Sequence, residues 1–139
     1  MKEILLALSS AVVWGTAPIL FKLGLKGSIP PLVGIFIHNA TATLFSLFTI
    51  IAFKTSLSYP LREILTVCLG GFISGFVGLL LYYKAIKIGD ISIVAPIAAS
   101  SPLWASLFAF IFLGETLNIY KVLGTLFIFA GITLLSLSR

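Results

Sequence analysis

Charged side chains are scarce in this chain of 139 residues. Lys, Arg, Asp and Glu make up 9% of it, hydrophobic residues make up 60%, and the mean hydropathy is +1.21. Soluble domains carry roughly 25% charged residues, and the core of so short a chain is too small to bury this much apolar surface. The composition excludes a water-soluble protein and predicts an integral membrane protein in contact with a lipid bilayer.

Residues that bind metals or carry out catalysis are almost missing. The chain has one cysteine, Cys68, and one histidine, His38, which excludes an internal disulfide and leaves no zinc or redox motif. The apolar runs hold no nucleophile paired with a base and no pair of carboxylates. We therefore expect no metal, no cofactor and no enzymatic activity.

Basic residues exceed acidic ones, giving a formal net charge of +5. They occur singly or in pairs between apolar runs, a pattern typical of residues that set membrane topology and touch lipid headgroups. The sequence therefore does not favour nucleic acid as a partner.

Five continuous apolar runs dominate the sequence, each with roughly the twenty residues needed to cross a hydrocarbon core. Continuous runs predict helices, because lipid offers backbone groups no other partner. The sequence thus predicts an all-α membrane fold with one domain, residues 1–139, and helices at about 4–25, 31–53, 61–83, 91–113 and 120–137. A cleaved signal peptide is an alternative for the first run, but Glu3 and the continuation to Leu25 argue against it.

Carboxylates are absent from the middle of every run, since Glu3, Glu63, Asp90 and Glu115 all fall at run ends. A proton-driven exporter of organic cations needs a carboxylate inside the membrane to hold a proton and a cation in turn. If the chain moves solutes, neutral or zwitterionic ones fit better.

Basic residues are divided almost evenly between the two sides of the membrane. Five spans place Lys2, Lys54, Arg62 and Lys121 on one side, and Lys22, Lys26, Lys84, Lys87 and Arg139 on the other. The α-amino group of Met1 removes the remaining difference. Orientation normally follows a clear basic bias. We favour insertion both ways with an antiparallel homodimer; the alternative is that context or a partner fixes one orientation.

Several residues inside the runs have two interpretations. His38 and Asn39 are adjacent on different faces of the second helix, and His38 is either a neutral interhelical hydrogen bonder or a proton-coupling group. Pro18, Pro96 and Pro102 predict kinks that either line a cavity or are covered by neighbouring helices.

Glycines in the third and fifth runs predict close helix packing, with a direct substrate role as the alternative. These glycines are Gly71, Gly75, Gly78, Gly124 and Gly131. Asp90 and Asn118 precede apolar runs and are predicted to cap the helices that follow. Lys22, near the end of the first run, is expected to extend to the membrane surface.

Three stretches resemble an EamA domain of the drug/metabolite transporter superfamily. The first is Val13-Trp14-Gly15-Thr16 with Lys22, and the second runs from Tyr82 to Lys87. The third runs from Ala95 to Leu135 and includes Pro102-Leu103-Trp104, Leu113-Gly114-Glu115-Thr116-Leu117, Gly124 and Ala130-Gly131. The resemblance covers nearly the whole chain.

The resemblance implies export or exchange of small metabolites such as amino acids by alternating access. Most members have two five-helix halves in inverted orientation around a central cavity, whereas this sequence has one. We therefore expect one half of an inverted-repeat transporter fold, completed by an antiparallel second copy. Glu115 matches the family's acidic position, where it is expected to bond helix ends at the membrane edge.

The predicted function is a multi-pass transporter of small molecules in the plasma or inner cell membrane. Its substrate pathway is predicted to lie between copies and to involve Trp14, His38, Asn39, Tyr82, Ser100 and Trp104. Two alternatives stay open. One is a non-transporting membrane subunit that pairs with another five-helix half, and the weaker one is a membrane enzyme.

Overall fold

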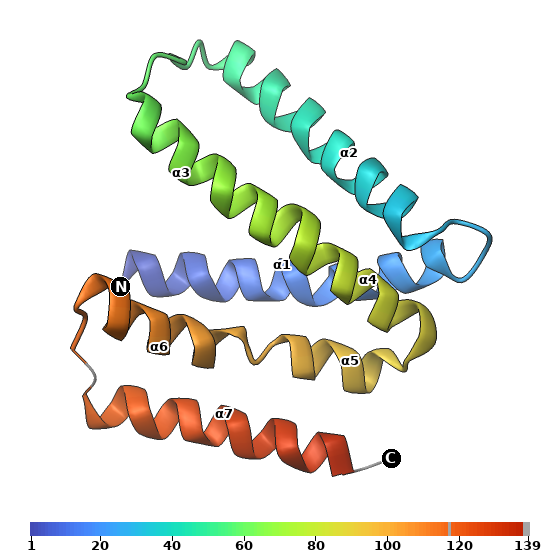
Figure 1. Cartoon of the computed structure of the whole chain (residues 1–139), viewed down its shortest axis with the longest axis vertical. Helices are drawn as coiled ribbons and strands as arrows, with labels where there is room; N and C mark the ends of the chain where they lie inside the picture. Colours follow the sequence, from blue (N-terminus) through green and yellow to red (C-terminus); the bar gives the residue numbers. More distant parts are fainter. Residues whose placement is uncertain (117, 138–139) are drawn as a thin grey trace. The chain divides into compact units, whose positions relative to one another are not determined.

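Helices account for every regular element in the described part of the chain, residues 1–116 and 118–137 of the computed structural model (Figure 1). The elements are α1 (Lys2–Leu25), α2 (Pro31–Ala52), α3 (Leu61–Gly71), the π-helix η1 (Phe72–Gly78), α4 (Leu79–Ile88), α5 (Ile91–Ala98), α6 (Ser101–Leu113) and α7 (Ile119–Leu137). Two predictions, on Leu117 in the Gly-Glu element and Arg139 in the charge balance, lie outside the described residues.

Five helical segments in this part of the chain are long and apolar enough to cross a membrane. α3, η1 and α4 form one continuous segment, Leu61–Ile88, and α5 with α6 spans Ile91–Leu113. The prediction of an all-α membrane protein with five transmembrane helices is confirmed.

The third span continues five residues beyond its predicted end at residue 83. The prediction stopped there because Lys84 and Lys87 interrupt the apolar run. In the structure this last turn packs inward, since Ile86 is fully buried and the Lys87 amine donates to a backbone carbonyl. Lysine at a helix C-terminus is also favoured by the partial negative charge there.

The prolines act differently in the two spans that contain them. α1 passes through Pro18 without interruption. The fourth span is broken at Ala99 and Ser100, between Pro96 in α5 and Pro102 at the start of α6. Proline lacks an N–H group and fits the first turn of a helix, so the second helix begins anew beside Pro102.

One of the two helix caps predicted from the sequence forms in the structure. The Asn118 side-chain oxygen accepts a hydrogen bond from the Lys121 N–H at 2.9 Å, which confirms the predicted cap of α7. Asp90 stands at the N-cap position of α5, but its side chain makes no capping hydrogen bond. Its backbone carbonyl accepts from Ile93 and Val94 instead.

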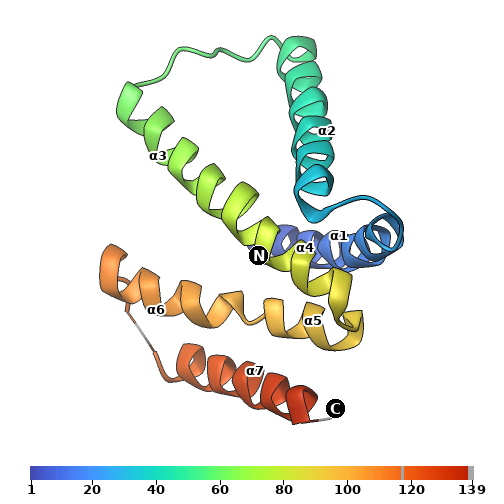
Figure 2. The same ribbon diagram turned by 45° about the vertical axis from the view of Figure 1, so that its right-hand side comes forward.

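Residues 1–88 form the first of two compact units. α1 and α2 both pack against α4, whereas α2 and α3 diverge toward the loop that joins them (Figure 2). The core of this unit consists of Leu25, Ile35 and Tyr83, with Phe21, Ile29, Leu79, Leu80 and Tyr82 packed around it.

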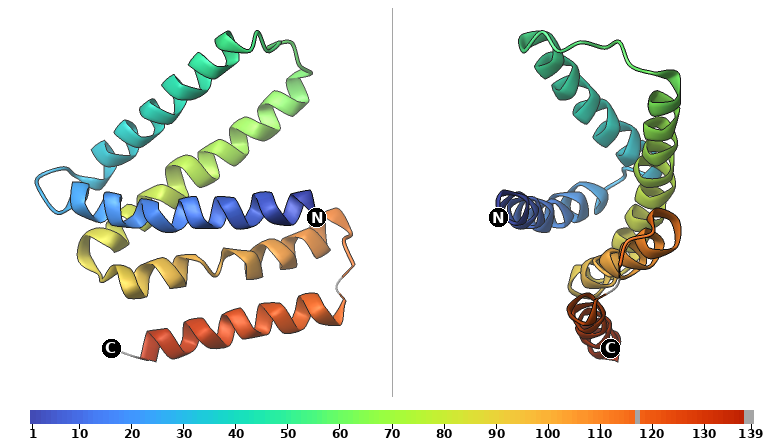
Figure 3. Two further views of the ribbon diagram at one scale, coloured as in Figure 1. Left: turned by 180° about the vertical axis from the view of Figure 1, so that it is seen from behind. Right: turned by 90° about the vertical axis from the view of Figure 1, so that its left-hand side faces the viewer.

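The second unit begins at Gly89. α5 and α6 follow each other, and α7 returns alongside both in the opposite direction (Figure 3).

Apolar side chains cover the outside of the helices. Among the described residues, the buried hydrophobic side chains are Leu25, Ile35, Tyr83 and Ile86. In water the hydrophobic effect would drive these apolar surfaces together. In a bilayer it does not drive the helices together, because lipid tails are as apolar as leucine. Helix contacts in this protein must therefore depend on close packing and on hydrogen bonds made by the few polar side chains inside the spans.

Candidate functional site

An aromatic cluster joins three helices of the first unit. Nδ1 of His38 on α2 lies 2.8 Å from the Tyr83 hydroxyl oxygen on α4. The Phe21 ring on α1 lies 4.9 Å from the Tyr83 ring and 5.2 Å from the His38 ring, between centroids. A hydroxyl or imidazole left unpaired in hydrocarbon costs free energy. Here each satisfies the other, as expected of an interhelical hydrogen bond.

Two lysines bind backbone carbonyls at the same end of this unit. The Lys22 amine on α1 donates to the Ile86 carbonyl of α4 at 2.7 Å, and the Lys87 amine donates to the Ile29 carbonyl at 2.8 Å. The last carbonyls of a helix lack N–H partners and carry partial negative charge, so the end of α4 offers the Lys22 amine an acceptor. That Lys22 extends to the membrane surface stays a prediction.

Asn39 connects α2 to the π-helix η1. Its side-chain amide donates to the Gly75 carbonyl at 2.9 Å. A π-helix displaces backbone groups from their usual α-helical partners, and such segments are frequent at functional sites. Asn39 supplies a donor at the middle of this irregular segment and fixes its own side chain by doing so.

The predicted packing glycines have different surroundings. A Cβ at Gly75 would lie 3.8 Å from the Asn39 side-chain oxygen, so this glycine faces another helix. At Gly78 the nearest atom is the Ile73 carbonyl oxygen, 3.3 Å away and in the same helix. A Cβ at Gly71, Gly124 or Gly131 would meet no atom within 4 Å. Their packing role stays a prediction.

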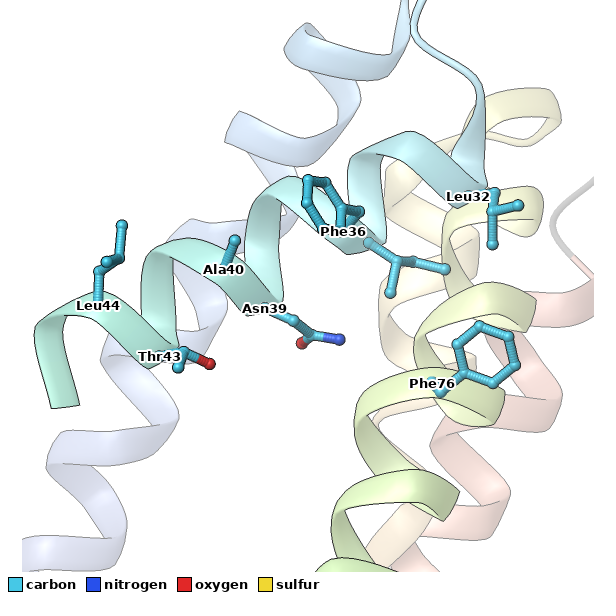
Figure 4. Close-up of a pocket in the computed structure, with 8 residues that line it drawn as sticks. Leu32, Phe36, Asn39, Ala40, Thr43, Leu44 and Phe76 are labelled. Carbon is cyan, nitrogen blue, oxygen red and sulfur yellow. The ribbon is translucent and has the colours of Figure 1, made fainter. Parts of the chain in front are cut away.

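A hollow of about 700 Å³ lies between α2 and η1 (Figure 4). Seven lining residues come from α2 and one from η1. They are Leu32, Ile35, Phe36, Asn39, Ala40, Thr43, Leu44 and Phe76. None is charged, and Asn39 and Thr43 carry the polar side chains. The hollow is thus an apolar surface with an amide and a hydroxyl one helical turn apart.

Thr43 differs from every other serine and threonine in the spans of this unit. The others donate to backbone carbonyls at 2.7–2.9 Å; they are Ser9, Ser10, Thr16, Thr41, Ser46, Thr49, Thr66 and Ser74. The Thr43 hydroxyl has no hydrogen-bond partner among the described residues. It is therefore available to a molecule outside the chain.

The six predicted pathway residues are divided between the units. His38 and Tyr82 lie at the aromatic core of the first unit, and Asn39 lines the hollow. Trp14, on α1, is 75% exposed and makes no ring contact with another described residue. Ser100 and Trp104 belong to the second unit, at the break before α6 and within that helix.

Sequence reasoning did not assign most residues of these two sites. Phe21 and Tyr83 complete the aromatic cluster, and seven of the eight residues that line the hollow, Phe76 and Thr43 among them, were not predicted as site residues. Thr43 carried a usable signal, because it follows Asn39 by four residues and so shares its helix face. The aromatic residues carried none that separated them from the many lipid-facing rings.

Glu115 pairs with Lys121 across the turn between α6 and α7. The carboxylate lies 3.5 Å from the Lys121 amine, which also donates to the Thr116 carbonyl at 3.1 Å. Both side chains are about half exposed, so the pair contributes little to stability. Its geometry matches the expected role of joining helix ends. No group of three or more His, Cys, Asp or Glu in the described ranges is placed to hold a metal ion.

Comparison with known families decides the class of the protein. Residues 1–137 match the model of the EamA-like transporter family. The chain belongs to this family. The resemblance predicted from Trp14, Pro102 and Glu115 is therefore confirmed, and the EamA-like chain is a multi-pass membrane protein of a transporter family.

Its relatives differ in length. The EamA-like chain is 40% identical over 77 residues to an uncharacterized transporter in cobO 3′ region of a Sinorhizobium species, covering 55% of this chain and 54% of that one. It is 29% identical to an uncharacterized Methanocaldococcus jannaschii protein, covering 98% of this chain and 97% of that protein. It is 25% identical to an uncharacterized transporter of Archaeoglobus fulgidus, covering 95% of this chain and 47% of the transporter.

Two of these three relatives are thus matched over only about half of their length. No solved structure matches the chain significantly.

Proposed function

We propose that this EamA-like chain exports or exchanges small neutral or zwitterionic solutes, such as amino acids, by alternating access in the cell membrane. The working unit is an antiparallel pair of copies with the pathway between them. The observation that carries the proposal is the even distribution of basic residues in a five-span chain of a transporter family.

The charge balance already holds within the first unit. Four lysines lie near the ends of α1 and α4, namely Lys22, Lys26, Lys84 and Lys87. The Lys22 bond joins these two helix ends, and the Lys87 bond joins α4 to Ile29 in the loop after α1. The helix directions assign Lys2, Lys54, Arg62 and the α-amino group of Met1 to the opposite side. Four positive charges face four, so this unit gives the insertion machinery no preferred orientation.

The lengths of the relatives support a pairing of two units. The chain covers nearly all of one relative and about half of another, so a five-helix segment corresponds to a complete short protein and to part of a longer one. Many transporters place their substrate site at the interface of two inverted repeats. A second copy in the opposite orientation supplies the same symmetry.

The proposed pathway uses aromatic rings and hydroxyl groups. Trp14, Tyr82 and Trp104 stack on solutes and close the ends of the path, and Ser100 orients solutes by hydrogen bonds. His38 and Asn39 lie behind or beside the path, since each already bonds to the third span. The absence of a carboxylate from the middle of the spans agrees with neutral or zwitterionic solutes.

Dual orientation is tested by two reporters fused after Arg139, one active only in the cytoplasm and one active only outside. We expect both to be active at similar levels. Removing two positive charges with Lys54→Ala and Arg62→Ala should shift the signal toward the cytoplasmic reporter, because the side with Arg139 then carries the basic excess.

Lys54→Arg is the matched control, since it keeps the charge and should leave the ratio unchanged. Activity of only one reporter in the unaltered chain contradicts the antiparallel homodimer. The search would then turn to a separate five-helix partner with the opposite charge bias.

Trp14→Ala should reduce solute transport about tenfold while leaving the amount of protein in the membrane unchanged. The ring is largely exposed in the chain, so its removal leaves little empty volume. Transport is measured as solute efflux from cells and abundance by quantitative blotting of membranes. Phe127→Ala on α7, equally exposed, is the control and should affect neither. Equal losses of transport and abundance for Trp14→Ala would indicate a folding role alone.

A further inference from the structure

We propose that the hollow between α2 and η1 binds an uncharged solute that has an apolar body and an amide-like head, with Thr43 and Asn39 selecting the head by hydrogen bonds. This inference rests on the proposed function and narrows its substrate class. It assigns Thr43 a specificity-determining role.

The proposed site contains hydrogen-bonding groups of Thr43 and Asn39 that the chain itself does not use. The Thr43 hydroxyl is left without a partner in a segment where all the neighbouring hydroxyl groups have one. Asn39 uses one amide hydrogen on the Gly75 carbonyl, which leaves a second donor and the oxygen acceptor. Water is not there to satisfy such groups at membrane depth, and each unpaired group is costly. A bound molecule with both a donor and an acceptor removes this cost.

The arrangement of the two side chains also supports the proposal. Asn39 and Thr43 are four residues apart, so they share one face of α2. Figure 4 shows both polar ends directed to the same side of the helix, toward the space flanked by Phe76 of η1. The bond from Asn39 to Gly75 holds the amide in one orientation. Its remaining groups are therefore preorganised, which lowers the entropic cost of binding.

The apolar lining selects the body of the solute. Phe36 and Phe76 offer ring faces, and Leu32 and Leu44 lie toward the ends of the lined stretch of α2. The volume of about 700 Å³ falls within the roughly 300–1,000 Å³ typical of small-molecule sites. An aromatic or branched aliphatic group with one polar head fits this lining.

The absence of charged side chains from the lining selects against ionised solutes. The eight lining residues include no acid and no base. Burying a carboxylate or an ammonium group in such surroundings is expensive unless an opposite charge pairs with it. The hollow therefore discriminates among neutral and zwitterionic solutes and favours the uncharged ones.

The test measures equilibrium binding of radiolabelled N-acetyl-L-phenylalaninamide to the full chain in lipid nanodiscs. Two probes with the same body carry a charge: N-acetyl-L-phenylalanine has a carboxylate, and L-phenylalaninamide has an ammonium group. We expect saturable binding of the uncharged probe and at least tenfold weaker binding of both charged ones. Thr43→Val keeps the shape of the side chain and should weaken binding of the uncharged probe about tenfold.

Thr41→Val is the matched control. Its hydroxyl donates to the Ile37 carbonyl, it does not line the hollow, and binding should stay unchanged. Asn39→Leu should weaken binding of the uncharged probe as well, but it removes the bond to η1 and can disturb folding. Thr43→Val carries no such risk because the hydroxyl has no partner within the described chain.

Equal binding of the three probes, an unchanged affinity in Thr43→Val, or no saturable binding at all would overturn this inference. Binding is measured without transport, so the two proposals can fail separately. Probe binding with no movement of any solute in proteoliposomes would leave the site standing and reject the transporter mechanism. Solute movement without probe binding would reject the site alone.

Discussion

Replacing Tyr83 by alanine should lower the free energy of unfolding by about 3–5 kcal/mol, the range for truncating a buried aromatic side chain. Tyr83 is 2% exposed and lies between α1 and α2. The substitution removes its contact with the Phe21 ring and leaves the His38 nitrogen without its partner. The effect is measured by unfolding the purified protein with a denaturing detergent in mixed micelles.

Two further variants separate packing from hydrogen bonding in this prediction. Tyr83→Phe keeps the ring and should lower the free energy of unfolding by about 0.6 kcal/mol, the average for an interhelical hydrogen bond in a membrane protein. Leu81→Ala, on the same helix but 65% exposed, should cost less than about 0.5 kcal/mol. A loss in Tyr83→Ala no greater than that of Leu81→Ala would show that the aromatic cluster is not a structural core.

Replacing Gly34 by leucine should destabilise the first unit by about 3 kcal/mol, at the upper end of the range for overpacking. A Cβ at this position would lie 3.0 Å from a Leu25 methyl carbon and 3.2 Å from two carbons of the Tyr83 ring. Three more carbons cannot be placed there unless α2 moves away from α1 and α4. The loss is measured by the same detergent titration.

Gly24→Leu is the matched control, because a Cβ there meets no atom within 4 Å. It should be neutral or slightly stabilising, since leucine favours the helix more than glycine does. If the two leucine variants unfold together, α1, α2 and α4 do not meet at Gly34 in the membrane.

The five spans could be predicted because lipid imposes a simple rule. A helix that crosses the hydrocarbon needs about twenty apolar residues, and the breaks at 26–30, 54–60 and 114–118 are too polar to continue one. Asn118 was found as a cap for the same local reason. The end of the third span was missed because Lys84 and Lys87 resemble a loop unless the buried contacts of Ile86 are known.

The partners of the polar residues could not be predicted. His38 and Asn39 stood out as polar groups in an apolar run, but lipid-facing helices are apolar on all sides and give no signal for their rotation. Nothing in the sequence distinguishes Tyr83 or Phe21 from aromatic residues exposed to lipid. The Asn39 amide binds the Gly75 carbonyl of the π-helix, and this contact joins residues 36 positions apart.

Lys22 illustrates the same limit. The position of Lys22 one turn from the end of an apolar helix predicts that its amine extends to the membrane surface, but it does not predict a bonding partner. In the structure this partner is the Ile86 carbonyl, 64 residues away. That acceptor exists only once α4 lies beside α1.

These lysines also affect how readily the folded unit could reverse its orientation in the membrane. Inverting the folded unit would carry Lys22 and Lys87, with the carbonyls that they bind, through hydrocarbon together with Lys26 and Lys84. At the 2.5–3.5 kcal/mol per charge given by insertion measurements, four lysines present a barrier of roughly 10–14 kcal/mol before any packing is lost. This cost opposes any change of orientation after the chain has been inserted. The four lysines at this end of the unit therefore favour keeping whichever orientation a chain adopts during its insertion.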